Sequence, residues 1–337
     1  MAPARARRTG TIGVLIGVAV SVVALVAVLR WAGWGPVVVA LQQMEPGYLG
    51  LAAAVFLLSM LARAVSWWLL LTRSVSLGRT LATLNEGYLL NNLLPWRLGE
   101  LGRAVLLGRQ PGMSTLRVLS TIVIERTYDV ILGTTLLVAM LPVVLRLGWA
   151  SRAALIWGGA VGLALLVLWL LVHHASRIEG WIGRKFPKPA LWQARWRRVH
   201  SGLAALESPS LFLGSFGAMA VSWILAGVDY WLVLRAFHPS PGWPWAYFML
   251  TATALGGAVP AAPGSIGVFE AAAVAALGAF AVSAGTALAA ALVLHAMVYA
   301  ITVSIGAVAL IRDGDTLQGL YQDVVGWLSR REQVEAP

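Results

Sequence analysis

Long apolar runs separated by short basic segments dominate the 337-residue chain. A hydrocarbon core of about 30 Å takes about 20 apolar residues to cross as a helix. Six runs reach that scale, at residues 11–29, 48–72, 118–145, 153–172, 211–234 and 286–311. A cleaved signal peptide is the alternative for the first run, but its apolar region typically has only about 7–15 residues. The pattern therefore predicts an all-α polytopic membrane protein with about six full spans.

Two further apolar stretches, 81–108 and 245–283, are interrupted by proline and glycine. The break in the first follows Asn91 and Asn92, and the break in the second follows Gly256. Proline removes a backbone donor and clashes with the preceding helical turn. We expect each stretch to form a re-entrant hairpin of two short helices. Such irregular backbone survives at membrane depth only when protein buries it or when it lines a cavity.

Composition and charge support this class and orient the chain. Hydrophobic residues make up 59% of it and charged residues only 12%, against about 25% charged in soluble domains. Under the expected topology, 19 of the 25 Lys and Arg residues fall at 1–10, 73–117, 173–210 and 312–337. The positive-inside bias then places both termini, the basic loop 173–210 and the tail 312–337 in the cytoplasm. The net charge of +11 thus indicates topology in the cell membrane rather than nucleic-acid binding.

The basic loop 173–210 also contains four aromatic residues, Trp181, Phe186, Trp192 and Trp196. This mixture suits a segment that lies on an anionic leaflet. A solvated basic loop explains it equally well, and both interpretations stay open.

An internal repeat relates the two broken stretches. Both carry the pattern P-x-x-x-G-x-x-G, as Pro95, Gly99, Gly102 and as Pro260, Gly264, Gly267. Span, span, broken hairpin, span occurs in 11–145 and again in 153–311, and three full crossings per half give the halves opposite orientations. We therefore expect one integral membrane domain, 1–337, built as an inverted repeat. Inverted repeats with broken helices are typical of many secondary transporters.

Candidate chemistry gathers at the breaks. The second half-helices are expected to start near Gly99 and Gly264 with free N–H groups, and such helix ends bind anions. Asn91, Asn92, Arg97, Gly99, Arg103, Gly264 and Gly267 are the expected headgroup-binding residues, and Pro95, Pro260 and Pro263 form the helix breaks. A charge in a span costs at least about 2.5–3.5 kcal/mol. The expected charge partners or proton carriers are Glu100, Glu125, Arg126, Asp129 and Glu270.

Each charged position also has a structural interpretation. Glu125, Arg126 and Asp129 equally suit an internal ion-pair network, and we expect Arg63 and Asp229 to snorkel or to form single pairs. His295 is expected to be a satisfied core residue. The chain contains no G-x-S-x-G, P-loop or H-E-x-x-H motif, so we expect no catalytic residue, metal or cofactor.

These motifs resemble one known family. The residues Asn91 to Pro95, Arg97, Gly99, Glu100 and Arg103, then Glu125, Arg126 and Asp129, then Pro260, Pro263, Gly264, Gly267, Phe269 and Glu270 are similar in order and spacing to that family's motifs. It is the flippase-like family, also called the lysylphosphatidylglycerol synthase transmembrane region, which includes the membrane half of the bacterial multiple peptide resistance factor. The resemblance implies a protein of the bacterial or archaeal cytoplasmic membrane that moves or handles polar lipids. Because only 312–337 follow the last span, we do not expect lysyl transfer.

The leading hypothesis is a lipid flippase or transporter that binds an anionic phospholipid or polyprenyl-phosphate headgroup at the paired breaks. One alternative is a membrane-embedded transferase that acts on a lipid or polyprenyl carrier. Another is an accessory subunit of a cell-envelope glycosyltransferase. The expected partners are membrane lipids, with a homo-oligomer or a cell-envelope enzyme as further possibilities.

Overall fold

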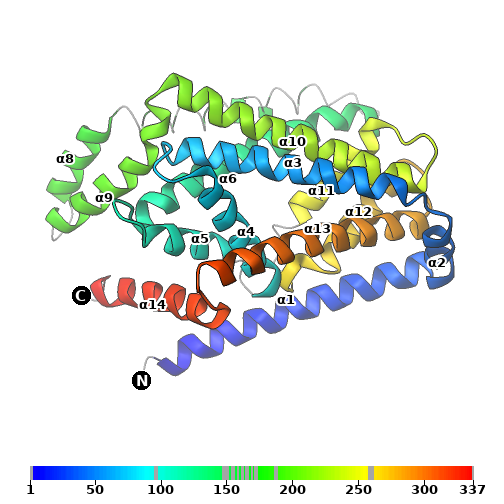
Figure 1. The fold of residues 1–337 in the computed structure, drawn as a ribbon, viewed down its shortest axis with the longest axis horizontal. Coiled ribbons are helices and arrows are strands. Elements are labelled where there is room, and N and C mark those ends of the chain that lie inside the picture. The colour runs from blue at the N-terminus through cyan, green and yellow to red at the C-terminus, as the bar shows by residue number, and fades with distance from the viewer. Residues whose placement is uncertain are drawn as a thin grey trace.

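The computed structural model describes residues 3–94, 98–145, 174–185, 189–256 and 262–335, together with scattered positions between 152 and 170. All regular structure in these ranges is helical (Figure 1). Four helices are long and apolar enough to cross a membrane: α3 (Gly47–Leu70), α6 (Thr115–Leu145), α10 (Pro209–Phe237) and α13 (Ala284–Arg312). The prediction of an all-helical, multi-pass membrane protein is confirmed.

A bent helix pair supplies a fifth candidate span at the N-terminus. Helix α1 (Pro3–Ala32) meets α2 (Trp34–Gln43) at an angle of 76°. Gly33 sits at the bend with a φ of 72°, a left-handed conformation that glycine adopts without strain. The expected span at 11–29 lies within α1, whereas the expected span at 153–172 falls largely outside the described residues. The total of six spans therefore stays a prediction.

Both broken stretches consist of two helices that pack against each other. The first comprises α4 (Leu77–Leu93) and α5 (Gly99–Gly108), and the second comprises α11 (Trp243–Gly256), η3 (Pro263–Ser265) and α12 (Val268–Gly278). The predicted breaks are thus present, and Pro263 begins η3. The other expected break residues, Pro95 and Pro260, lie outside the described residues.

Glycines at the breaks allow close approach between chain segments. A side chain on Gly99 would overlap the carbonyl oxygen of Gly87 on α4, and one on Gly267 would overlap the carbonyl oxygen of Ser21 on α1. Gly267 also has a φ of 87°. The repeated glycine pattern therefore permits packing of α5 on α4 and of the second break on α1.

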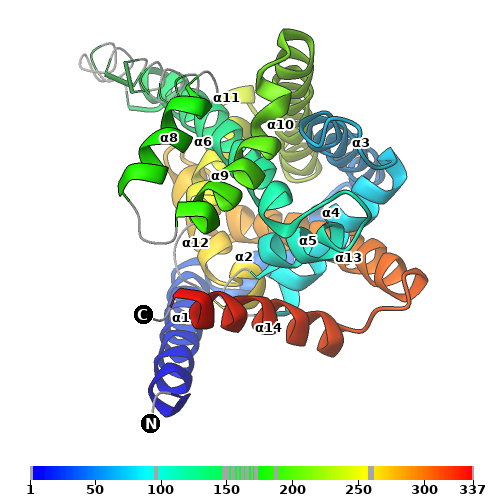
Figure 2. The ribbon, with the colours of Figure 1, turned by 90° about the vertical axis from the view of Figure 1, so that its left-hand side faces the viewer.

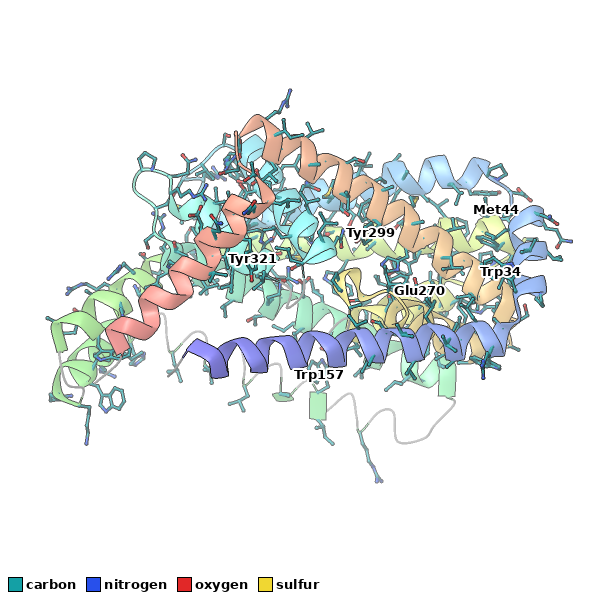
Figure 3. The ribbon with its side chains drawn as sticks, turned by 90° about the horizontal axis from the view of Figure 1, so that it is seen from below. Trp34, Met44, Trp157, Glu270, Tyr299 and Tyr321 are labelled. Atoms are coloured by element: carbon teal, nitrogen blue, oxygen red, sulfur yellow. The ribbon has the colours of Figure 1, made fainter. Side chains whose placement is uncertain are left out.

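Small polar residues join the two halves of the chain along α3 and α10, which pack against each other over much of their length (Figure 1). The Ser59 hydroxyl donates to the Ser222 carbonyl at 2.9 Å, and the Ser66 hydroxyl donates to the Ser215 carbonyl at 2.8 Å. Serine lets helix backbones approach closely and bonds across the interface, as is common in membrane helix pairs. Helix α1 runs along another face of the bundle and contacts α12 (Figure 3).

The more polar helices gather at one end of the molecule. Helices α8 (Ala175–Lys185), α9 (Pro189–Leu203) and α14 (Leu317–Glu335) lie there with both chain termini (Figures 1 and 2). Helix α9 packs against α6 and continues into η2 (Ala204–Leu206). The basic loop 173–210 is therefore largely helical in its described part, and the common end agrees with termini on one side. Which side faces the cytoplasm stays a prediction.

Candidate functional site

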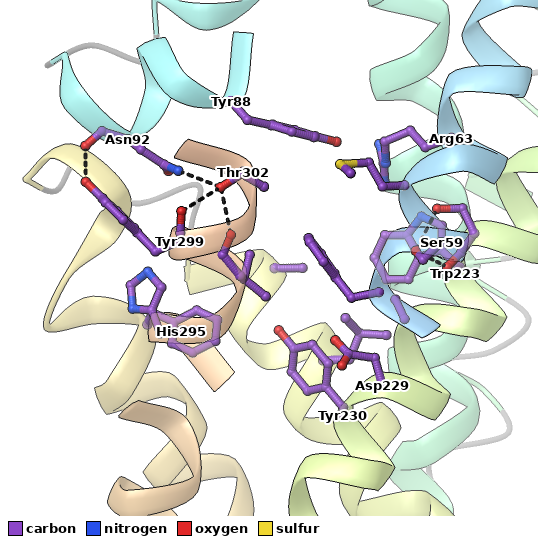
Figure 4. A pocket seen from close by; sticks show the side chains of 18 of the residues that line it. Ser59, Arg63, Tyr88, Asn92, Trp223, Asp229, Tyr230, His295, Tyr299 and Thr302 are labelled. Atoms are coloured by element: carbon purple, nitrogen blue, oxygen red, sulfur yellow. Dashed lines mark hydrogen bonds between the residues drawn. The ribbon is translucent and has the colours of Figure 1, made fainter. Parts of the chain in front are cut away.

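A cavity of about 330 Å³, the central cavity, lies between several helices of the bundle (Figure 4). Its walls come from α3 and α4 before residue 95, and from α10, α11, α12 and α13 after residue 209, with one residue of α6. The ionisable side chains that line it are Arg63, Tyr88, Arg126, Asp229, Tyr230, His295 and Tyr299. Segments far apart in sequence thus form a cavity whose wall combines apolar side chains with several ionisable ones.

A cluster of five charged residues adjoins one end of the cavity. Arg63 of α3 contacts both carboxylate oxygens of Asp129 on α6, at 2.8 and 2.9 Å, and one oxygen of Glu125 at 3.3 Å. Arg126 contacts Glu125 at 2.9 Å and Asp129 at 3.2 Å. The indole N–H of Trp223 on α10 also donates to Asp129 at 3.0 Å. Arg63 therefore joins two carboxylates, where we expected snorkelling or a single pair.

Arg103 completes this cluster from α5. Its guanidinium contacts Glu125 at 2.8 Å and lies 4.4 Å from the centre of the Trp67 ring. Only 3% of the Arg103 side chain is exposed, so its charge depends on these partners. The structure thus places Arg103, Glu125, Arg126 and Asp129 together in an ion-pair network, and their role in binding or proton transfer stays a prediction.

Arg126 is the member of the cluster with unused hydrogen-bonding capacity. Its side chain is 39% exposed, and its buried Nε has no hydrogen-bond partner in the described part of the chain. Arg126 lines the central cavity and also a second, more open pocket of about 470 Å³. That pocket has a mainly apolar wall on α6, formed by Leu119, Ile122, Val123, Val130 and Ile131.

The helix N-termini at the two breaks are capped by the protein's own side chains. The Gly99 N–H donates to the Asn91 amide oxygen at 2.8 Å, and the Gly267 N–H donates to a Glu270 carboxylate oxygen at 2.6 Å. The Asn91 amide nitrogen lies 3.5 Å from a Glu100 carboxylate oxygen. We expected free N–H groups near Gly99 and Gly264, but the N–H groups of Gly99 and Gly267 already have acceptors.

The second helix start also differs from the expectation. Helix α5 begins at Gly99 as expected, but α12 begins at Val268 rather than near Gly264. Gly264 and Gly267 have φ values of 69° and 87°, which a right-handed helix excludes. Arg97 was expected beside the first helix start and lies outside the described residues.

Helix α13 connects the two breaks. The Tyr299 hydroxyl donates to the Asn92 carbonyl at 2.5 Å, and the Asn92 amide donates to the Thr302 hydroxyl at 3.0 Å (Figure 4). The Tyr299 ring also packs on Gly264, where an added Cβ would lie 2.6 Å from the ring. One tyrosine thus touches the first break through Asn92 and the second through Gly264.

His295 of α13 binds Glu270, so this core histidine has a carboxylate partner. The His295 Nδ1 lies 2.6 Å from the Glu270 carboxylate oxygen that does not accept the Gly267 N–H. Sequence reasoning missed this pair and the bridging role of Tyr299. Polar residues 295, 299 and 302 recur at helical spacing on an otherwise apolar helix, and that periodicity was the available signal.

Asp229 lies at the end of the cavity away from Arg63 (Figure 4). The residue is 1% exposed, and its Oδ1 has no hydrogen-bond partner in the described ranges. Asp229 therefore neither snorkels nor forms a single pair among the described residues, which were the two arrangements that we expected. Nor do three or more His, Asp or Glu side chains come together there in a way that could hold a metal ion.

Comparison with known families accounts for this combination of apolar spans, broken helices and buried charges. The model of the family described as "Lysylphosphatidylglycerol synthase TM region" matches residues 14–306. The chain belongs to this family. The match includes both breaks, the charged cluster and α13 up to residue 306, and it confirms the resemblance of the motifs. Membership indicates a membrane protein related to lipid handling or lipid modification. No curated protein matches the chain.

Proposed function

We propose that this family member is a flippase-like lipid transporter of the cell membrane. It binds the anionic headgroup of a phospholipid or polyprenyl phosphate in the central cavity and moves the lipid between leaflets. The position of Arg126 carries the proposal, because this residue lines both the central cavity, which contains charged side chains, and the more open apolar pocket. A lipid needs such a junction, because its charged headgroup and its hydrocarbon chain require different environments.

Arginine suits this junction chemically. Its planar guanidinium matches the geometry of phosphate oxygens and binds them with two parallel hydrogen bonds. Arg63, Arg103 and Arg126 contact only two carboxylates in the cluster, Glu125 and Asp129. A bound phosphate would balance the excess guanidinium charge through Arg126, whose side chain is 39% exposed.

The second pocket suits the hydrocarbon part of the same lipid. Val123 and Val130 of α6 line it and are 60% and 57% exposed. A lipid chain against this wall would stay in an apolar environment while its headgroup contacts Arg126. In this arrangement only the headgroup enters the protein, so only the headgroup pays an energetic cost of desolvation.

The two breaks supply elements that can rearrange during transport. Part of the proposal is that the halves form an inverted repeat, in which the first hairpin opens to the cytoplasm and the second to the outside. Rocking of such repeats around a central site gives alternating access in many transporters. Contacts of α13 with both breaks support coupled movement.

Reconstituted vesicles test the transport proposal directly. Purified protein is placed in vesicles that contain fluorescent phosphatidylglycerol, and loss of label accessible to an external quencher reports lipid movement. Arg126→Ala should slow movement at least about tenfold, since a hydrogen bond to a charged group contributes about 1.5–3 kcal/mol and 1.4 kcal/mol is tenfold. Arg312→Ala removes an exposed arginine at the end of α13 and is the matched control. Equal rates for both variants would refute the headgroup site.

The same preparation separates transport from the transferase alternative. Formation of a new lipid product by the protein in detergent, where the two leaflets no longer exist, would favour an enzyme. We expect no such product.

Topology is tested by cysteine scanning, because the chain contains no cysteine. Single cysteines in 85–105 should react with a membrane-impermeant reagent only from the cytoplasmic side, and those in 255–272 only from the outside. Labelling of both stretches from one side would refute the inverted repeat.

A further inference from the structure

Asp229 is the charged side chain of the cavity that the proposed headgroup site does not use. It comes from the membrane-spanning helix α10 and lines the cavity. It is 1% exposed, and its Oδ1 has no hydrogen-bond partner in the described part of the chain. A buried carboxylate in this position needs a positive charge or a proton, because an isolated ionised group in an apolar interior is costly.

The arginines of the described cavity wall already form ion pairs with carboxylates other than Asp229. Arg63, on the neighbouring helix α3, binds Asp129 and Glu125, and Arg126 of α6 binds the same two carboxylates. Asp129 itself faces α10 and accepts the Trp223 N–H. Arg63 lies at the end of the cavity away from Asp229 (Figure 4).

The titratable groups on the other packed helices are also engaged. His295 of α13 is bound to Glu270 of α12, and the Tyr299 hydroxyl is bound to the Asn92 carbonyl. Tyr230, beside Asp229 on α10, shares its hydroxyl with Thr253 of α11 at 2.9 Å. The remaining titratable groups of α11 and of the cavity wall are two tyrosines, Tyr247 and Tyr88. Helices α2 and η2, which also pack on α10, contain no titratable residue.

We propose that Asp229 is the proton-binding site of the transporter, and that one proton and one anionic headgroup occupy the central cavity together. This inference rests on the proposed function of the cavity. The proton enters Asp229 from water on the side to which the cavity is open, and it leaves on the other side with the headgroup. The O–H bond of the Asp229 carboxyl group forms when the proton enters and breaks when it leaves, no other bond changes, and a singly charged lipid anion then moves with one proton without net charge transfer.

Electrostatic repulsion supplies the coupling. An ionised Asp229 repels an anionic headgroup held by Arg126, whereas a protonated Asp229 does not. We take the two negative charges to be about 10 Å apart, in a medium with an effective dielectric constant of about 20. Protonation of Asp229 then strengthens binding of the headgroup roughly tenfold. Coupling between two sites is reciprocal, so headgroup binding must in turn favour the protonated form of Asp229.

A pH gradient across reconstituted vesicles tests the inference. The membrane potential is clamped with potassium and valinomycin, and fluorescent phosphatidylglycerol is followed in both directions. Wild-type protein should move the lipid several times faster toward the alkaline side than toward the acidic side. Asp229→Asn mimics the protonated side chain and should still move lipid, at equal rates in both directions. Asp229→Glu restores a carboxylate and should restore the asymmetry.

A matched control and a second measurement make the test independent of transport. Glu45→Gln neutralises an exposed carboxylate between α2 and α3 and should behave like wild type. In weakly buffered detergent solution, titration of wild-type protein with phosphatidylglycerol should take up at most about half a proton per lipid bound, near the pH at which Asp229 titrates, which is the amount that a roughly tenfold coupling allows. Asp229→Asn should bind the lipid without proton uptake. This measurement requires folded protein but not lipid transport.

The outcomes distinguish the inference from the proposed function. Lipid movement by wild type that ignores the pH gradient would overturn the inference and leave the transport proposal intact. An asymmetric rate or proton uptake that survives in Asp229→Asn would remove Asp229 from the mechanism. Loss of movement in that variant only for a lipid with an ammonium group, without any pH effect, would assign Asp229 to that cation instead. A wild type that moves no lipid overturns both.

Discussion

Removal of the Glu125 charge is the most demanding test of the charged cluster. Glu125 is fully buried and contacts Arg63, Arg103 and Arg126 at 3.3, 2.8 and 2.9 Å. The substitution Glu125→Gln keeps the size of the side chain but leaves three guanidiniums with the single carboxylate of Asp129 among the described partners. Arg103 is affected most, because its ion pair with Glu125 is the one ion pair found for it in the described ranges.

The magnitudes follow from which charge loses its partner. Glu125→Gln leaves the buried Arg103 charge uncompensated and should lower the free energy of unfolding by about 3–5 kcal/mol. Arg103→Met keeps an apolar side chain near Trp67, and Glu125 still contacts two guanidiniums. Its cost should be about 0.5–2 kcal/mol, the scale of the lost cation–π contact. In the double variant the unpaired guanidinium is gone, so Arg103→Met should recover about 1–3 kcal/mol of the stability lost by Glu125→Gln.

Unfolding in mixed detergent–lipid micelles, with increasing sodium dodecyl sulphate and circular dichroism as the signal, measures these free energies. The two single variants, the double variant and wild type form a double-mutant cycle. The decisive result is that Arg103→Met stabilises the Glu125→Gln protein, because the costs of two unrelated losses of packing would add. An Arg103→Met cost equal to that of Glu125→Gln, or additive costs in the double variant, would refute the assignment of Glu125 as the shared counter-charge.

Two further predictions concern packing. Gly99→Ala places a methyl group against the Gly87 carbonyl and should destabilise the protein by about 1–3 kcal/mol. Gly50 on α3 has open space around it, so Gly50→Ala should be neutral or should stabilise the protein by up to about 1 kcal/mol. Unfolding in the same micelles compares the two variants. Leu320→Ala removes a fully buried contact of α14 and should destabilise that helix by about 2–5 kcal/mol. Arg109→Ala should cost about 1 kcal/mol or less, because its ion pairs with Asp315, just before α14, and with Asp323 of α14 are exposed. Hydrogen exchange of residues 317–335 reads this difference, and equal protection in both variants would contradict it.

The sequence predicts those features of the fold that depend on local physics. Apolar runs longer than about 18 residues become helices, and proline with glycine interrupts two of them, as α4 with α5 and α11 with α12 show. The cluster was accessible in part for the same reason, because Glu125 and Asp129 lie four residues apart on one helix and so share a face. These inferences need only the periodicity of one helix.

Partners from other helices were beyond that reasoning. Arg63 lies 62 residues from Glu125 in sequence and Trp223 lies 94 from Asp129, and no local pattern specifies which membrane helices pack together. For this reason Arg63 and Asp229 were both expected to snorkel or to pair singly. The structure instead gives Arg63 two carboxylates, and it gives Asp229 a buried place on the cavity wall.

The glycines at the breaks show how a correct pattern can carry a different physical meaning. Helix ends bind anions when their first N–H groups are free, but here Asn91 and Glu270 already accept hydrogen bonds from Gly99 and Gly267. A headgroup would have to displace these caps to bind there, whereas the Arg126 side chain lines the cavity and is 39% exposed. Because an exposed guanidinium can bind a phosphate without displacing a helix cap, we place the proposed headgroup contact at Arg126 rather than at the helix ends. The glycines of the breaks are then needed for close packing of the irregular backbone beside the cavity.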